Sequence, residues 1–216
     1  LESHLDGMQL MVGETEIWTR LIGRFNASNL LAVYGCATLC GLNKEEVLTI
    51  LSRQMPVRGR FETMRSGSGV TGIVDYAHTP DALRNVMKTI AQVSNGKTQL
   101  ITVVGAGGDR DASKRPLMGG VAAEFSQKLI LTSDNPRNEK PEDIIHQMME
   151  GIPAEKRKAV LSIPDRREAI KTAVMLASRG DIILVAGKGH EDYQEIKGKK
   201  HHFNDKEVLQ EYLKTT

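Results

Sequence analysis

From about Phe61 to the end of the chain, short apolar runs alternate with segments of helical periodicity. The first of five such runs ends at Asp75, and the others cover residues 100–104, 129–132, 160–163 and 182–185. Regular alternation of strands and helices is typical of a parallel sheet that is covered by helices on both faces. The sequence therefore predicts an α/β fold with a mostly parallel sheet flanked by helices.

Helix-start signals follow these runs and support the same fold. Thr79 and Pro80 fit the first positions of a helix, and Asp165 and Asn204 each precede a Glu by three residues, which is the capping-box spacing. We expect helices over about 80–93 and 113–125, from 141, from 166, and over about 204–214.

Residues 1–58 have a different pattern. A pair of alternating runs around Gly13 predicts a hairpin over about 6–21, and two helices are expected over about 27–40 and 44–53. A hairpin and two helices bury little surface, so we interpret residues 1–58 as the tail of a larger domain and residues 59–216 as a separate domain. The chain begins at Leu1 without a methionine, and we expect it to be a fragment or a processed product.

The amino-acid composition argues against several classes of function. Lys and Arg number 29 and Asp and Glu 27, so the net charge of +2 gives no reason to expect nucleic acid or an anionic membrane as a partner. No apolar run is long enough to span a bilayer. The only cysteines, Cys36 and Cys40, cannot build a disulfide framework, which favours a cytoplasmic location.

Polar segments follow four of the predicted strands, at 75–78, 105–111, 133–137 and 187–191. Ligands of open parallel sheets bind at the carboxyl ends of the strands, so these loops are expected to converge. They combine cations such as Arg110 and Arg137 with carboxylates such as Asp75 and Glu191. This mixture suits a zwitterionic or multiply charged small molecule.

Each of these signals also has an ordinary structural explanation. The glycines of 105–108 can be turn residues, and a dinucleotide site is poorly supported because Arg110 replaces the third glycine of G-x-G-x-x-G. His78 alone would more often be a hydrogen-bonded loop residue. His201 and His202 lack a companion at metal spacing, so we predict solvated strand residues and no metal site.

Seven motifs together closely resemble the C-terminal part of the Mur ligases, and in particular of the members that add the third residue of the peptidoglycan stem peptide. The resemblance covers nearly the whole chain and keeps the family's order of motifs. These motifs are F-N-x-x-N at 25–29, G-R-F-E at 59–62, D-Y-A-H-T-P at 75–80, G-G-D-R-D at 107–111, K-R-P at 114–116, D-N-P-R at 134–137 and A-G-K-G-H-E-D at 186–192.

The resemblance implies an ATP-dependent amide ligase that couples a diamino acid to UDP-MurNAc-L-Ala-D-Glu through an acyl phosphate. It implies a Rossmann-like C-terminal domain, preceded here by the tail of the central ATPase domain. ATP and Mg²⁺ are the implied cofactors. The phosphate loop of the family is absent from this sequence, so the resemblance places the main Mg²⁺ ligands in the missing N-terminal and central domains, and the chain alone is expected to be inactive.

The resemblance also assigns roles to individual residues, none of them catalytic or metal-binding. Positions that meet ATP are matched by Asn29, Arg60, Asp75 and His78. Positions that hold the incoming diamino acid are matched by Arg110, Asp134, Asn135, Pro136, Arg137, Gly187 and Glu191. Guanidinium groups can bind carboxylates, Asn135 can bond to either end of an amino acid, and Glu191 can accept from an ammonium.

Arg137 favours meso-diaminopimelate as that amino acid, because family members that use it carry Arg after Asp-Asn-Pro. Lysine or ornithine is the alternative within the family, and a non-catalytic amino-acid or nucleotide-binding module is the alternative outside it. A structural alternative is that Arg137 only pairs with Asp134 or Glu139.

Overall fold

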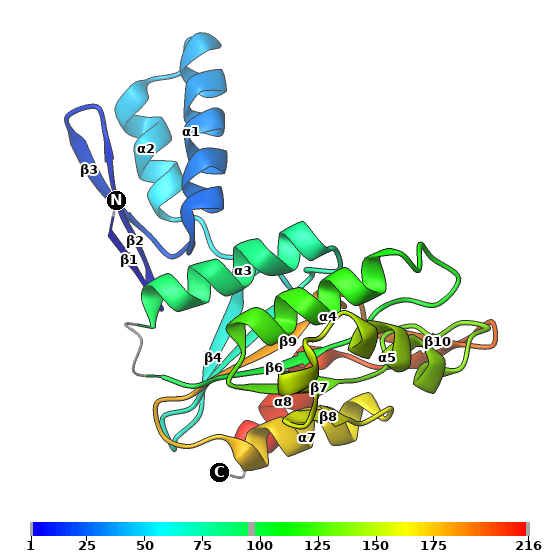
Figure 1. The fold of residues 1–216 in the computed structure, drawn as a ribbon. Coiled ribbons are helices and arrows are strands. Elements are labelled where there is room, and N and C mark those ends of the chain that lie inside the picture. Colours follow the sequence, from blue (N-terminus) through cyan, green and yellow to red (C-terminus); the bar gives the residue numbers. More distant parts are fainter. Residues whose placement is uncertain (1, 95–97, 215–216) are drawn as a thin grey trace. The chain divides into compact units, whose positions relative to one another are not determined.

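The computed structural model describes residues 2–94 and 98–214, and Figure 1 shows its fold. The chain divides into two compact units, one formed by Leu1–Val57 with Thr89–Gly96 and the other by Arg58–Lys88 with Lys97–Thr216. Each unit has a hydrophobic cluster of its own.

The first unit is a small antiparallel sheet with two helices. The sheet has the order β1-β2-β3 and consists of β1 (Glu2–His4), β2 (Gly7–Val12) and β3 (Thr15–Thr19). The predicted hairpin corresponds to β2 and β3, whereas β1 was not predicted. Helices α1 (Arg24–Leu39) and α2 (Lys44–Ser52) follow, and the Asn43 side chain caps α2 by accepting from the backbone N–H of Glu45 and Glu46.

The core of the first unit is modest. Its hydrophobic cluster comprises the buried residues Met8, Leu10, Ile17, Leu30, Val47, Leu48 and Leu51. Large apolar side chains of the same unit remain exposed on α1, where Leu31 is 60% and Leu39 is 90% accessible. Cys36 on this helix and Cys40 at its C-cap are exposed free thiols.

The second unit is built on a six-stranded sheet with the order β4-β5-β9-β6-β7-β8. Its strands are β4 (Glu62–Arg65), β5 (Thr71–Asp75), β6 (Leu100–Val104), β7 (Lys128–Leu131), β8 (Val160–Ser162) and β9 (Ile182–Ala186). All neighbours are parallel except β4, which pairs with β5 in the antiparallel direction. The prediction of a mostly parallel sheet is confirmed.

Strand β9 lies between β5 and β6 although it is the last of the sheet strands in the sequence. The chain runs outward from β6 through β7 to β8 and then returns to the middle of the sheet. As a result β5, β9, β6 and β7 are consecutive neighbours, and the loops after them leave the same edge side by side.

Helices cover both faces of this sheet (Figure 1). One face carries α4 (Lys114–Phe125), which contacts β6 and β7, with α5 (Pro141–Glu150) packed on α4; α3 (Pro80–Val93) begins in this unit. The other face carries α7 (Arg166–Leu176) and α8 (Asp205–Leu213). Alternate residues of a strand point to opposite faces: Ile101 and Val103 join the cluster beneath α7, whereas the Thr102 hydroxyl accepts from Ser126 at the end of α4.

The caps of the helices are mostly those expected from the sequence. Asp165 accepts from the N–H of Glu168, and Asn204 accepts from the N–H groups of Lys206 and Glu207. Ser113 is different, because its side chain makes no cap and instead donates to Asp111.

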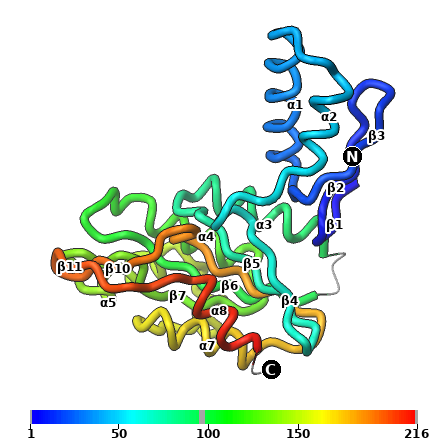
Figure 2. The backbone as a smooth tube through the Cα atoms, turned by 180° about the vertical axis from the view of Figure 1, so that it is seen from behind, coloured from blue at the N-terminus to red at the C-terminus, as the bar shows by residue number. Residues whose placement is uncertain are grey.

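Three elements of the second unit were not predicted, namely β4, the short helix α6 (Ala154–Arg157) and β10 (Tyr193–Ile196), which forms a hairpin with β11 (Lys199–His202). Their sequences are short and polar, so no apolar run marks them. In both Figure 1 and Figure 2 the hairpin lies at the same end of the unit as α5. His201 and His202 are exposed strand residues, as predicted. None of the helices within residues 2–94 and 98–214 is long and apolar enough to cross a membrane.

Candidate functional site

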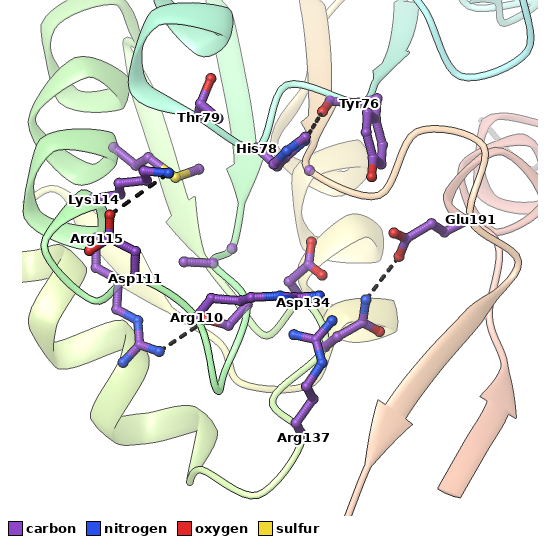
Figure 3. Close-up of a pocket in the computed structure, with 16 residues that line it drawn as sticks. Tyr76, His78, Thr79, Arg110, Asp111, Lys114, Arg115, Asp134, Arg137 and Glu191 are labelled. Atoms are coloured by element: carbon purple, nitrogen blue, oxygen red, sulfur yellow. Dashed lines mark hydrogen bonds and ion pairs between the residues drawn. The ribbon is translucent and has the colours of Figure 1, made fainter. Parts of the chain in front are cut away.

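A cavity of about 370 Å³ opens where the loops after β5, β9, β6 and β7 meet. Figure 3 shows side chains from all four loops pointing toward it. Its size falls within the range of small-molecule sites. The lining residues are Tyr76, His78, Thr79, Gly105, Ala106, Gly107, Arg110, Asp111, Lys114, Arg115, Met118, Asp134, Asn135, Arg137, Gly187 and Glu191.

The loop after β6 is held from below by Arg115. This side chain is only 2% exposed and donates to both carboxylate oxygens of Glu139 at 2.7 and 2.8 Å, and to the Gly107 carbonyl at 3.0 Å. Glu139 also accepts from the backbone N–H of Asp109. These contacts fix the loop backbone directly before Arg110, which is itself exposed at the cavity.

Arg137, from the loop after β7, contacts the loop after β6. Its Nη1 donates to the Gly108 carbonyl at 2.7 Å, and its Nε lies 3.3 Å from Glu195 Oε2 on β10. Its backbone N–H and carbonyl pair with Glu195 and Lys197 of the hairpin. Arg137 therefore pairs with Glu195 rather than with Asp134 or Glu139, which corrects the structural alternative derived from the sequence.

Amide and carboxylate groups also line the cavity. Asn135 donates from Nδ2 to Glu191 Oε2 at 2.8 Å, and its Oδ1 accepts from the Lys188 ammonium at 3.0 Å. Lys188 is fully buried and also donates to Glu191 at 3.2 Å. A buried amine is stable only when it is paired in this way.

Asp134 is the most enclosed acidic group that lines the cavity. Burial raises the pKa of its carboxyl above the ordinary value, although the positive charges of Arg166 and Lys188 oppose this. Gly187 packs against the same carboxylate, and a Cβ at position 187 would approach Asp134 Oδ2 to 2.7 Å. With φ at +120°, only glycine fits there.

The loop after β5 forms the remaining wall. Asp75 is 5% exposed and accepts from the backbone N–H groups of Phe61 and Ala77 at 2.7 and 2.8 Å, which shapes the loop. Burial raises the pKa of Asp75 despite these bonds. Tyr76 contacts the His78 ring edge-on, and the Arg60 guanidinium lies 4.6 Å from the centre of the Tyr76 ring.

The structure brings most of the predicted residues together. Those that line the cavity are His78, Arg110, Asp134, Asn135, Arg137, Gly187 and Glu191. Asp75 and Pro136 lie behind the loops, where the Pro136 carbonyl faces Gly108, and Arg60 reaches the site wall through Tyr76. Asn29 is an exposed residue of α1 in the first unit.

Arg115 and Lys188 stand in motifs noted in the sequence, but neither was assigned a role there. The burial of Arg115 depends on Glu139, which is distant in the sequence. Lys188 stands between two glycines directly after the fully buried strand β9, and that position was the available signal for a functional lysine.

Comparisons with known proteins agree with this geometry. The family model described as "Mur ligase, glutamate ligase domain" matches residues 59–189, more than half of the chain. The UDP-N-acetylmuramoyl-L-alanyl-D-glutamate--2,6-diaminopimelate ligase of Bacteroides thetaiotaomicron is 60% identical over 211 residues, covering 98% of this chain and 44% of the relative. The Bacteroides fragilis ligase of the same name is 59% identical over 216 residues, covering 100% and 44%.

Solved structures show the same similarity. A structure of a ligase with that name is 39% identical, with a TM-score of 0.71, and the match covers 98% of this chain and 44% of the other. The UDP-N-acetylmuramate-alanine ligase of Thermotoga maritima shares the fold at 16% identity, with a TM-score of 0.67 over 98% and 43%. The chain thus spans less than half the length of these relatives.

Proposed function

The chain belongs to the Mur ligase family, and we propose that it is the C-terminal part of a cytoplasmic ATP-dependent ligase that adds meso-diaminopimelate to UDP-MurNAc-L-Ala-D-Glu. Bound ATP would supply the phosphoryl group that activates the carboxylate of the dipeptide. The amine of the diamino acid would then attack the acyl phosphate, giving the tripeptide, ADP and phosphate. The names of the relatives support this assignment.

The charge arrangement of the cavity carries the proposal for the amino acid. Arg110 and Arg137 bring positive charge to the cavity lining, and Asp134 and Glu191 bring negative charge (Figure 3). The distal end of meso-diaminopimelate carries one carboxylate and one ammonium, which matches this combination of charges. L-Lysine and ornithine carry only the ammonium and would leave the arginines without a ligand.

The nucleotide would meet the wall formed by the loop after β5. Arg60 is exposed and is held on the Tyr76 ring, so its charge suits a phosphate group. Asp75 shapes this loop, His78 lies beside Tyr76, and Asn29 of the first unit is proposed to meet the adenine. No group of three or more acidic, His or Cys side chains in the described residues could hold Mg²⁺, and we place its main ligands in the rest of the ligase.

A chimera tests this function. The matching part of the Bacteroides thetaiotaomicron ligase would be replaced by this chain, and tripeptide formation would be measured with meso-diaminopimelate, L-lysine and ornithine. We expect activity with meso-diaminopimelate, and no ADP release from the 216-residue chain alone. Activity with L-lysine or ornithine instead would show that the substrate is that amino acid and not meso-diaminopimelate. An inactive but folded chimera whose chain still binds amino acids would favour a binding module.

A further inference from the structure

Lys188 lies just behind the cavity and faces three of the residues that line it. Its side chain is fully buried, and its Nζ lies 3.0 Å from Asn135 Oδ1, 3.2 Å from Glu191 Oε2 and 4.0 Å from Asp134 Oδ1. It does not line the cavity itself. Any effect of Lys188 on a ligand must therefore pass through these neighbours.

The contacts of Asn135 fix the orientation of its amide group. Its Oδ1 accepts from Lys188 Nζ and from the backbone N–H of Glu195 at 2.9 Å. An ammonium and a backbone N–H can only donate, so the amide oxygen must face them. The Nδ2 group must then face the cavity side, where it donates one hydrogen to Glu191 and has a second one to offer.

Asn135 can therefore offer only an N–H to a bound molecule. The sequence alone left open whether it would meet a carboxylate or an ammonium. With both oxygen lone pairs committed to Lys188 and Glu195, it can bind a carboxylate and cannot accept from an ammonium.

We propose that Lys188 is a positioning residue that sets the amino-acid specificity of the site, by holding Asn135 as a hydrogen-bond donor toward a distal carboxylate and by balancing the charge of Glu191. This inference rests on the function proposed above. Part of the preference for a diamino acid with a distal carboxylate would then come from a buried side chain outside the cavity.

The charge balance supports the same conclusion. Asp134 and Glu191 both line the cavity. The Lys188 ammonium contacts Glu191 directly, whereas the nearby guanidinium of Arg166 forms its ion pair with Asp205. Without the ammonium, Glu191 would lose its direct cationic partner, and only the Glu195 N–H would still hold the oxygen of Asn135. Both changes favour the bare ammonium of L-lysine over the zwitterionic end of meso-diaminopimelate.

Lys188→Met in the chimera tests this proposal. Met keeps the length of the side chain and removes the charge. We expect the ratio of kcat/KM for meso-diaminopimelate to that for L-lysine to fall about tenfold or more, mainly through a higher KM for meso-diaminopimelate. Lys200→Met is the matched control, because both lysines lie over the Tyr193 ring, Lys188 at 5.6 Å and Lys200 at 4.1 Å, but Lys200 is exposed on β11. The ratio of the two kcat/KM values should not change in this control.

A purely structural role for Lys188 would lower both reactions alike, and an unchanged ratio would overturn the proposal. Asn135→Asp provides a second test if Lys188→Met does not fold. An Asp at position 135 still accepts from Lys188 and Glu195 but presents an acceptor instead of an N–H to the cavity, so the same fall in the ratio is expected. If the wild-type chimera ligated no diamino acid, both the proposed function and this inference would be refuted. If the wild-type chimera were active but the variants kept its ratio of kcat/KM values, only the inference would be refuted.

Discussion

The Arg166 guanidinium and the Asp205 carboxylate form a fully buried ion pair, with Nε 2.8 Å from Oδ1 and Nη2 2.7 Å from Oδ2. Burial opposes the charge of Arg166, but Asp205 outweighs it and raises the pKa of the guanidinium. Arg166 also donates to the carbonyls of Ser133 and Ala186 at 3.3 and 3.1 Å. The pair thus connects the first residues of α7 and α8 with the ends of two site loops.

Removing one member of this pair should destabilise the second unit strongly. Asp205→Asn leaves a buried guanidinium without its counter-charge, and we expect a loss of about 3–5 kcal/mol. The opening free energy of the β9 amides in native-state hydrogen exchange would measure it. Arg167→Met is the control, because its partner Glu211 is exposed and the pair is expected to contribute below about 1 kcal/mol. Equal losses in the two variants would contradict this prediction.

Glu139 should make the stability depend on pH in the acid range. The hydrogen bonds from Arg115 lower the pKa of this carboxyl below its ordinary value of 4.5. A carboxyl with a lower pKa in the folded state stabilises that state above the unfolded pKa, and the contribution is lost as the pH falls through the folded pKa. The difference in urea-unfolding free energy between wild type and Glu139→Gln should be constant from pH 7 to about 5 and shrink below about 4.5.

The matched variant for Glu139 is Glu124→Gln, because Glu124 pairs with Arg84 on the surface, where both side chains are more than a third exposed. The difference in unfolding free energy between wild type and Glu124→Gln should stay small over the same pH range. A Glu139→Gln difference that persists unchanged at acidic pH would show that Arg115 does not depend on the charge of this carboxylate.

Gly108 should tolerate no side chain. A Cβ at this position would overlap the Pro136 carbonyl oxygen, and the Gly108 N–H and carbonyl are used by Asn135 and Arg137. Gly108→Ala must therefore separate the loops after β6 and β7. We expect the variant to lose meso-diaminopimelate binding in calorimetric titration, while the β9 amides stay protected from hydrogen exchange. Gly67→Ala, where a Cβ meets nothing within 4 Å, should bind as wild type does.

The central strands of the sheet could be predicted because they are buried on both faces and are therefore nearly continuous apolar runs, as in β6 and β9. The polar hairpin β10–β11 carries no such signal. Its position depends on long-range contacts, among them the bonds of the Arg137 backbone with Glu195 and Lys197. Local patterns do not encode such contacts.

The site shows the same limit. The polar loops at the carboxyl ends of the predicted parallel strands showed which segments converge, and the cavity contains Arg110, Asn135 and Glu191 as expected. The buried supports were not predictable, because the sequence shows neither that Lys188 is enclosed nor which carboxylate pairs with Arg115. The assignment of individual residues to ATP and to the diamino acid stays a prediction.

Arg137 provides the most direct test of substrate choice. Its contacts with Gly108 and Glu195 use Nη1 and Nε, and its Nη2 forms no hydrogen bond with any residue in 2–94 or 98–214. The guanidinium lines the cavity and is therefore positioned with a free donor toward it. Meso-diaminopimelate differs from L-lysine by one distal carboxylate, and hydrogen bonds to charged groups contribute about 1.5–3 kcal/mol.

In the chimera, Arg137→Ala should therefore lower kcat/KM for meso-diaminopimelate about ten- to a hundredfold and affect L-lysine much less. The preference for meso-diaminopimelate over L-lysine becomes smaller but does not invert, because Arg110 and Asn135 still line the cavity. The backbone bonds of residue 137 with Glu195 and Lys197 do not need the side chain, so the hairpin should stay in place. Arg137→Lys should recover only part of the preference, because an ammonium lacks the planar fork of the guanidinium. If Arg137 served only to pair with Glu195, Arg137→Ala would lower protection of the β10 amides and leave the ratio of the two amino acids as it is in wild type.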